Sequence, residues 1–77
     1  MELWIRSQDE MNLCKIKDLV IRENYNGYGD TDYVIQDIYT MGTYKTKERA
    51  LEVLDEIQNI LIDYSGMSRV VYQMPKE

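Results

Sequence analysis

The sequence predicts an α+β fold of two layers, in which an antiparallel sheet of four to five strands carries one long helix, at about residues 46–64, on one face. Three observations predict it. Several short segments alternate apolar and polar residues, as half-buried strands do. A segment rich in Asn, Gly and Asp separates two of them, and one later stretch repeats apolar residues at helical spacing. With 77 residues the chain has enough material for one core only, so residues 1–77 form a single domain.

The first predicted strand is residues 3–7, where Leu3 and Ile5 share one face and Trp4 and Arg6 share the other. Chain ends usually fray unless a sheet or a docked element holds them. We therefore expect this strand to be paired inside the sheet, which places the only tryptophan on an anchored segment.

Three more strands follow before the helix. Residues 13–23 are rich in Ile, Val and Leu and predict a strand, but their alternation fails near 17–18, where a bulge would restore an apolar inner face. Residues 24–32 contain the residue types that accept a positive φ, so they predict a hairpin loop. Residues 33–40 predict a third strand, and residues 42–45 predict either a short fourth strand or an extended approach to the helix.

The helix has the strongest local signal in the chain. Thr46 is a suitable N-cap, and Glu48 places a negative charge at the positive end of the helix. The apolar residues at three- and four-residue spacing are Ala50, Val53, Leu54, Ile57, Ile60, Leu61 and Tyr64. Gly66 is suited to a left-handed C-terminal cap. Residues 69–74 alternate again and predict a last strand, which Pro75 ends.

Composition excludes several classes of function. Fourteen acidic residues against nine basic ones give a net charge of -5, which argues against direct binding to a nucleic-acid duplex. No apolar run approaches the ~20 residues of a membrane span, so no membrane partner is expected. A single cysteine cannot form an intrachain disulfide. These features indicate a reducing, cytoplasmic setting.

Enzyme chemistry has few candidate residues here. The chain has no histidine, and Cys14 lies among apolar residues, where cysteine behaves as a small hydrophobic side chain. The glycine-rich loop at 24–32 is not followed by the helix and the Lys-Ser/Thr pair of a phosphate-binding P-loop, and it lacks the glutamate of a calcium loop. We therefore predict a protein that is not an enzyme, with no metal and no cofactor.

Three segments carry a resemblance to known sequences: residues 3–9 (LWIRSQD), residues 44–58 (YKTKERALEVLDEIQ) and residues 71–75 (VYQMP). They resemble a group of small uncharacterised proteins of phages, prophages and mobile elements of Gram-positive bacteria. The similarity covers both ends and the helix, but not residues 19–41. It implies a phage or prophage setting and an accessory role, and it assigns no functional residue.

One candidate ligand site combines an aromatic plane with guanidinium groups, which suits a nucleotide because the base stacks and the phosphate is held bidentately. Its residues are Trp4, Arg6, Arg22, Arg69 and Tyr72. The chain would then sequester an anionic, nucleotide-like signal of host defence in pockets shared between subunits. The alternative is structural: Trp4 packs under the helix, and Arg6 pairs with an acidic residue on a neighbouring strand.

A second candidate surface is the acidic side of the helix, formed by Glu48, Glu52, Asp55, Glu56 and Asp63. Such a stripe is usually the solvated side of an amphipathic helix. Its functional interpretation is an acidic inhibitor that imitates the phosphates of DNA and docks onto a host protein. For either function we expect a homo-oligomer, because a short single-core domain without staples is only modestly stable and exposed strand edges invite pairing.

Overall fold

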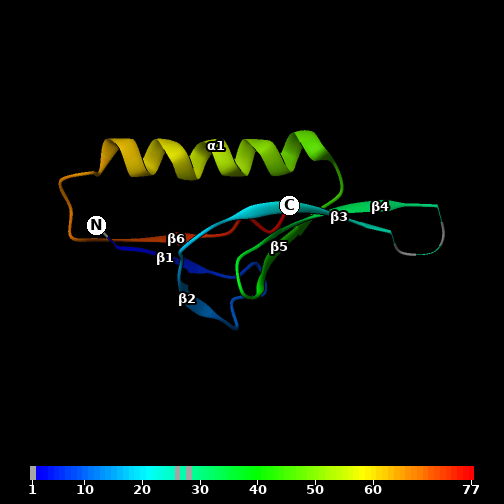
Figure 1. Cartoon of the computed structure of the whole chain (residues 1–77), viewed down its shortest axis with the longest axis horizontal. Coiled ribbons are helices and arrows are strands. Elements are labelled where there is room, and N and C mark those ends of the chain that lie inside the picture. The colour runs from blue at the N-terminus through cyan, green and yellow to red at the C-terminus, as the bar shows by residue number, and fades with distance from the viewer. Residues whose placement is uncertain (1, 26, 28) are drawn as a thin grey trace.

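The computed structural model describes residues 2–25, 27 and 29–77, and it shows that a helix lies across one side of a set of strands (Figure 1). The elements in chain order are β1 (Glu2–Arg6), β2 (Leu13–Lys15), β3 (Val20–Tyr25), β4 (Thr31–Gln36), β5 (Thr40–Tyr44), α1 (Lys47–Asp63) and β6 (Arg69–Gln73). The predicted α+β class is confirmed.

The strands form two sheets, which corrects the predicted single antiparallel sheet of four to five strands. The first sheet has the order β2-β1-β6, and the second sheet has the order β3-β4-β5. β1 pairs antiparallel with β2 but parallel with β6, so the first sheet is mixed. A parallel neighbour requires a long crossover, and the chain between β1 and β6 includes the whole second sheet and α1.

The predicted strand at residues 13–23 is divided between the two sheets. Its first part is β2 and its last part is β3, and the chain crosses from one sheet to the other at the position where a bulge was expected. Ile16 and Leu19 both pack against the core. A continuous strand would direct them to opposite faces, so the chain bends between them, and the Lys17 N–H donates to the Asp37 carboxylate at 3.1 Å.

The predicted strand at residues 33–40 is also divided. β4 ends at Gln36, and the chain turns so that Ile38 is 85% exposed before β5 begins at Thr40. Between β3 and β4 the predicted hairpin loop is present, with Gly27 and Gly29 at φ of 88° and 84°. Asn26 and Tyr28 of that loop lie outside the described residues.

Both bounds of the predicted helix are confirmed to within a residue, but its predicted C-terminal cap is wrong. Thr46 is the N-cap, with an extended backbone at φ -124°, and its hydroxyl accepts the Arg49 N–H at 3.1 Å. Gly66 does not take the predicted left-handed conformation. The C-cap is Tyr64, whose N–H donates to the Ile60 carbonyl at 2.9 Å and closes the last turn without glycine.

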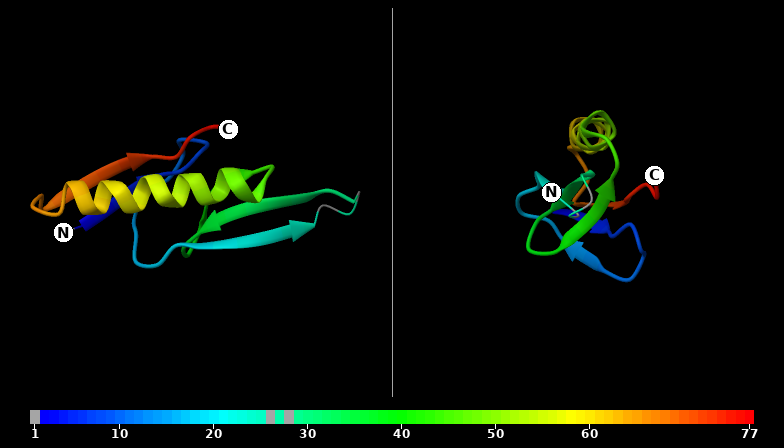
Figure 2. Two further views of the ribbon diagram at one scale, coloured as in Figure 1. Left: turned by 90° about the horizontal axis from the view of Figure 1, so that it is seen from above. Right: turned by 90° about the vertical axis from the view of Figure 1, so that its right-hand side faces the viewer.

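One hydrophobic core joins both sheets to α1. Its buried members are Leu3, Ile5, Ile35, Met41, Tyr44, Ala50, Val53, Ile57, Tyr72 and Met74. The predicted inner face of the first strand, Leu3 and Ile5, is therefore confirmed. The β3–β4 hairpin extends past the N-terminal end of α1 (Figures 1 and 2), and the molecule measures 45 × 23 × 19 Å.

Candidate anion-binding pocket

Three of the predicted ligand residues lie on one surface, the side of the first sheet that faces away from the core. In the pairing of β1 with β6, Trp4 is opposite Val71, and Arg69 is opposite Glu2. Paired residues share a face, and alternate residues of one strand share it too, so Arg6 also belongs to this surface. We call it the outer face. Trp4 is half-buried there instead of packing under the helix.

The polar groups of the outer face already have partners within the chain. The Glu2 carboxylate accepts from Lys15 Nζ and from Arg69 Nε, each at 3.1 Å, and from the Trp4 indole N–H at 3.2 Å. Arg6 Nε donates to the carbonyl oxygen of Glu10 at 3.1 Å. An anion bound here would have to compete with these contacts.

These contacts make a prediction about acid stability. The hydrogen bonds from Trp4, Lys15 and Arg69 lower the pKa of Glu2 from 4.5 to about 2. A carboxylate with a lowered folded-state pKa stabilises the fold above its unfolded pKa and loses that contribution as the pH falls through its folded pKa. We expect NMR of the Glu2 side-chain carboxyl carbon to show a titration midpoint near pH 2. The midpoint should be higher when Lys15 and Arg69 are both changed to Gln. An unchanged midpoint would contradict this network.

Arg22 and Tyr72 lie elsewhere, so the five predicted residues do not form one site. Arg22 is exposed on β3 in the second sheet, opposite Val34. Tyr72 is 6% exposed in the core, and its hydroxyl has no hydrogen-bond partner among the described residues. Burial raises the pKa of Tyr72, and the negative charge of Glu56 adds to the effect. The ring is therefore neutral and covered.

A different cavity gathers cationic side chains at the N-terminal end of α1. It has a volume of about 350 Å³ and is lined by residues 43–46, Arg49, Lys76 and Glu77. We call it the α1 pocket. Three of its residues, Lys45, Arg49 and Lys76, carry positive charge, and the first helical turn adds the partial positive charge of its unpaired N–H groups. The cavity thus has the electrostatics of an anion site, although Glu77 contributes one negative charge.

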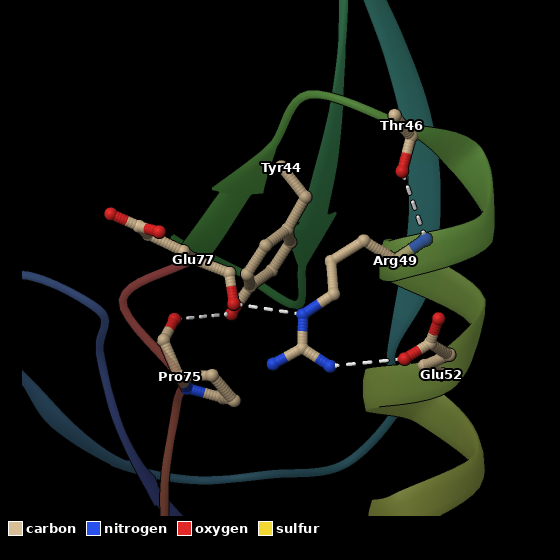
Figure 3. Close-up of polar contacts among 6 residues, drawn as sticks. All are labelled: Tyr44, Thr46, Arg49, Glu52, Pro75 and Glu77. Carbon is tan, nitrogen blue, oxygen red and sulfur yellow. Dashed lines mark hydrogen bonds and ion pairs between the residues drawn. The ribbon is translucent and has the colours of Figure 1, made fainter.

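Arg49 stands at the centre of this pocket (Figure 3). Its Nε donates to the main-chain oxygen of Glu77 at 2.8 Å, and its Nη1 lies 3.3 Å from a carboxylate oxygen of Glu52. One N–H group of the guanidinium therefore contacts a residue of the same helix, and another donates to an oxygen from a distant part of the chain. Each contact uses a single N–H, so neither partner is held in the bidentate arrangement by which arginine recognises carboxylate and phosphate groups.

Hydrogen bonds of Tyr44 and Gln8 join the two segments that line the α1 pocket, residues 43–49 and 76–77. The Tyr44 hydroxyl donates to the Pro75 carbonyl at 2.8 Å, and burial raises its pKa to about 12, so it remains a donor at neutral pH. The Gln8 side chain accepts the Thr43 N–H at 2.9 Å and donates to the Lys76 carbonyl at 2.7 Å. Together these bonds fix residues 75–77 beside the start of α1.

Sequence reasoning missed the α1 pocket because its lining comes from two segments that are distant in the sequence, 43–49 and 76–77, and Gln8, which bonds to both, comes from a third. The one local signal was the basic pair around the N-cap, with Lys45 before Thr46 and Arg49 three residues after it. Nothing in the local pattern marks Gln8 or Lys76 as their neighbours.

The acidic residues of α1 are the second candidate surface. Glu48, Glu52, Asp55, Glu56 and Asp63 are all exposed, as an amphipathic helix requires. Glu52 is engaged by Arg49, and no acidic residue lies between Glu56 and Asp63.

Other chemical groups are sparse in the part of the chain that the structure describes. No cluster of three acidic, Cys or His side chains suited to a metal occurs there, and Cys14 is a free, half-buried thiol. None of the described helical segments has the length and apolar character needed to cross a membrane. No protein-family model matches the chain, and no curated protein or solved structure is significantly similar to it.

Proposed function

We propose that this chain is a non-catalytic binding protein that holds an anionic, nucleotide-like ligand in the α1 pocket. The observation that carries the proposal is the convergence of Lys45, Arg49 and Lys76 on the first turn of a helix. Helix N-termini bind phosphate groups through their free N–H groups and positive dipole end. A volume of about 350 Å³ falls within the ~300–1,000 Å³ range of small-molecule sites.

In this proposal the phosphate takes the place of the Glu77 oxygen on the Arg49 guanidinium, which the Glu52 carboxylate keeps oriented. Lys45 and Lys76 supply point charges on flexible stems, which tolerate different phosphate geometries. The phage setting implied by the sequence resemblance supports a nucleotide signal of host defence as the ligand, which the protein would remove by sequestration.

Calorimetry with ADP and with inorganic pyrophosphate tests the proposal. Changing Lys45 and Lys76 together to Gln should weaken binding about 100-fold or more, because charge-assisted hydrogen bonds contribute roughly 1.5–3 kcal/mol each and about 1.4 kcal/mol is tenfold in affinity. Lys47→Gln is the matched control, since Lys47 is an exposed lysine in the first turn of α1 that does not line the pocket. Binding should also weaken as salt is added.

The same measurement compares the α1 pocket with the outer face. Loss of binding in Trp4→Ala and Arg6→Ala, with the double lysine variant unaffected, would move the site to the first sheet. If the protein binds neither ADP nor pyrophosphate at millimolar concentration, the proposal of a nucleotide-like ligand is contradicted for these two compounds.

The second candidate function is an acidic inhibitor of a host protein. The observation that favours it is that all five acidic residues along α1 are exposed. Neutralising Glu48, Glu56 and Asp63 together, with Glu52 kept because it contacts Arg49, would abolish activity in an infected host under this function, whereas the double lysine variant would retain it. The two sets of variants in one infection assay therefore separate the two functions.

A further inference from the structure

The outer edge of β6 offers an unpaired row of main-chain groups. Glu2 N–H donates to the Ser68 carbonyl at 2.9 Å, and Met74 N–H donates to the Arg6 carbonyl at 3.0 Å. Alternate residues of a strand direct their N–H and C=O groups to the same neighbour. The even-numbered residues from 68 to 74 therefore bond β1, and the main-chain groups of Arg69, Val71 and Gln73 point away from it. No strand among the described residues pairs with that edge.

The side chains along this edge make it suited to a partner strand. Val71 is 62% exposed on the outer face, next to the half-buried Trp4. The charge of Arg69 is compensated by Glu2 at 3.1 Å. Gln73, at the other end, is neutral. Within β6 there is no proline, which is one of the devices that protect an edge strand. In the view from above, β6 lies along the margin of the first sheet (Figure 2).

We infer that the partner of this edge is a second copy of the chain, which pairs antiparallel with β6 about a two-fold axis at Val71. Val71 would then face Val71 of the partner subunit, and Arg69 would face Gln73 of the partner subunit. Because all these residues direct their main-chain groups outward, each facing pair exchanges two hydrogen bonds. A parallel in-register pair would instead set Arg69 against its own copy, so the charge pattern favours the antiparallel arrangement.

This arrangement joins two three-stranded sheets into one continuous sheet and leaves neither β6 edge open, as a closed two-fold interface does. It does not involve the α1 pocket, so it stands or fails separately from the proposed ligand binding.

Val71→Pro is the sharpest variant. Its N–H points away from β1, so proline there spares the β1–β6 pairing but removes the central donor of the free edge. In analytical ultracentrifugation at micromolar concentration we expect the wild type at about twice the chain mass of 9.2 kDa and Val71→Pro near 9.2 kDa with an unchanged circular dichroism spectrum. Val71→Thr, which keeps the branched shape and the N–H, should remain a dimer. A monomeric wild type, or a Val71→Pro dimer, would overturn the inference.

Hydrogen exchange on the unchanged protein gives a test that does not depend on how the variant folds. The Val71 amide should be protected at high concentration and should lose that protection on dilution, whereas the Tyr72 amide, directed to β1, should stay protected in both conditions. A Val71 amide that exchanges rapidly at all concentrations would show that the β6 edge is free.

Discussion

Replacing Ile57 with alanine should lower the free energy of unfolding by about 2–4 kcal/mol, because it empties a central position of a closely packed core. Ile57 is 3% exposed and lies in the single cluster that joins α1 to both sheets. Urea unfolding followed by circular dichroism measures the difference. The neighbouring Glu56→Gln is the control, since Glu56 is exposed and its change should be nearly neutral.

Equal losses in the two variants would contradict the assignment of the helix faces. A small loss in Ile57→Ala with an unchanged Glu56→Gln would instead indicate that α1 settles closer to the sheets when the side chain is removed.

Replacing Gly42 with alanine should destabilise the protein by about 1–3 kcal/mol, the usual range for an overfilled core. An added Cβ would lie 2.9 Å from the Tyr44 hydroxyl oxygen and 3.1 Å from the Met74 methyl carbon. Neither neighbour can withdraw easily, because the hydroxyl is bonded to the Pro75 carbonyl and Met74 is fully buried. The effect should therefore reach the wall of the α1 pocket as well as the core.

Gly66→Ala is the matched control for this substitution. No atom lies within 4 Å of its added Cβ, and its φ is not positive. Thermal unfolding should show a lower midpoint for Gly42→Ala and little change for Gly66→Ala. A Gly42→Ala variant as stable as the wild type would mean that Tyr44 and Met74 are loosely packed.

The features that could be predicted from the sequence are those governed by neighbouring residues. The helix, its Thr46 cap and the inward position of Ile57 follow from apolar spacing and local capping chemistry. The alternation of Leu3 and Ile5 similarly predicted which side of β1 is buried. In each case the information lies within one turn of helix or one short strand.

The features that could not be predicted depend on contacts between distant residues. Nothing local shows that Ile16 and Leu19 bend the chain from one sheet to another, or that β1 lies parallel to β6. The separation of the five candidate ligand residues in the fold could not be predicted for the same reason. Arg6 was favoured because it shares a strand face with Trp4, whereas Arg49 is the arginine that lines a pocket with Lys76 at a helix end.

The parallel pairing of β1 with β6 also bears on how the molecule folds. Its contacts join residues as far apart as Glu2 and Arg69, with a sequence separation of 67, whereas the β3–β4 and β4–β5 hairpins join near neighbours. Closing a loop of that length costs on the order of 4 kcal/mol in chain entropy beyond a constant term, and such non-local contacts slow folding. We therefore expect the second sheet and α1 to assemble first. During synthesis, the edge of β1 that pairs with β6 stays unpaired until β6 has left the ribosome.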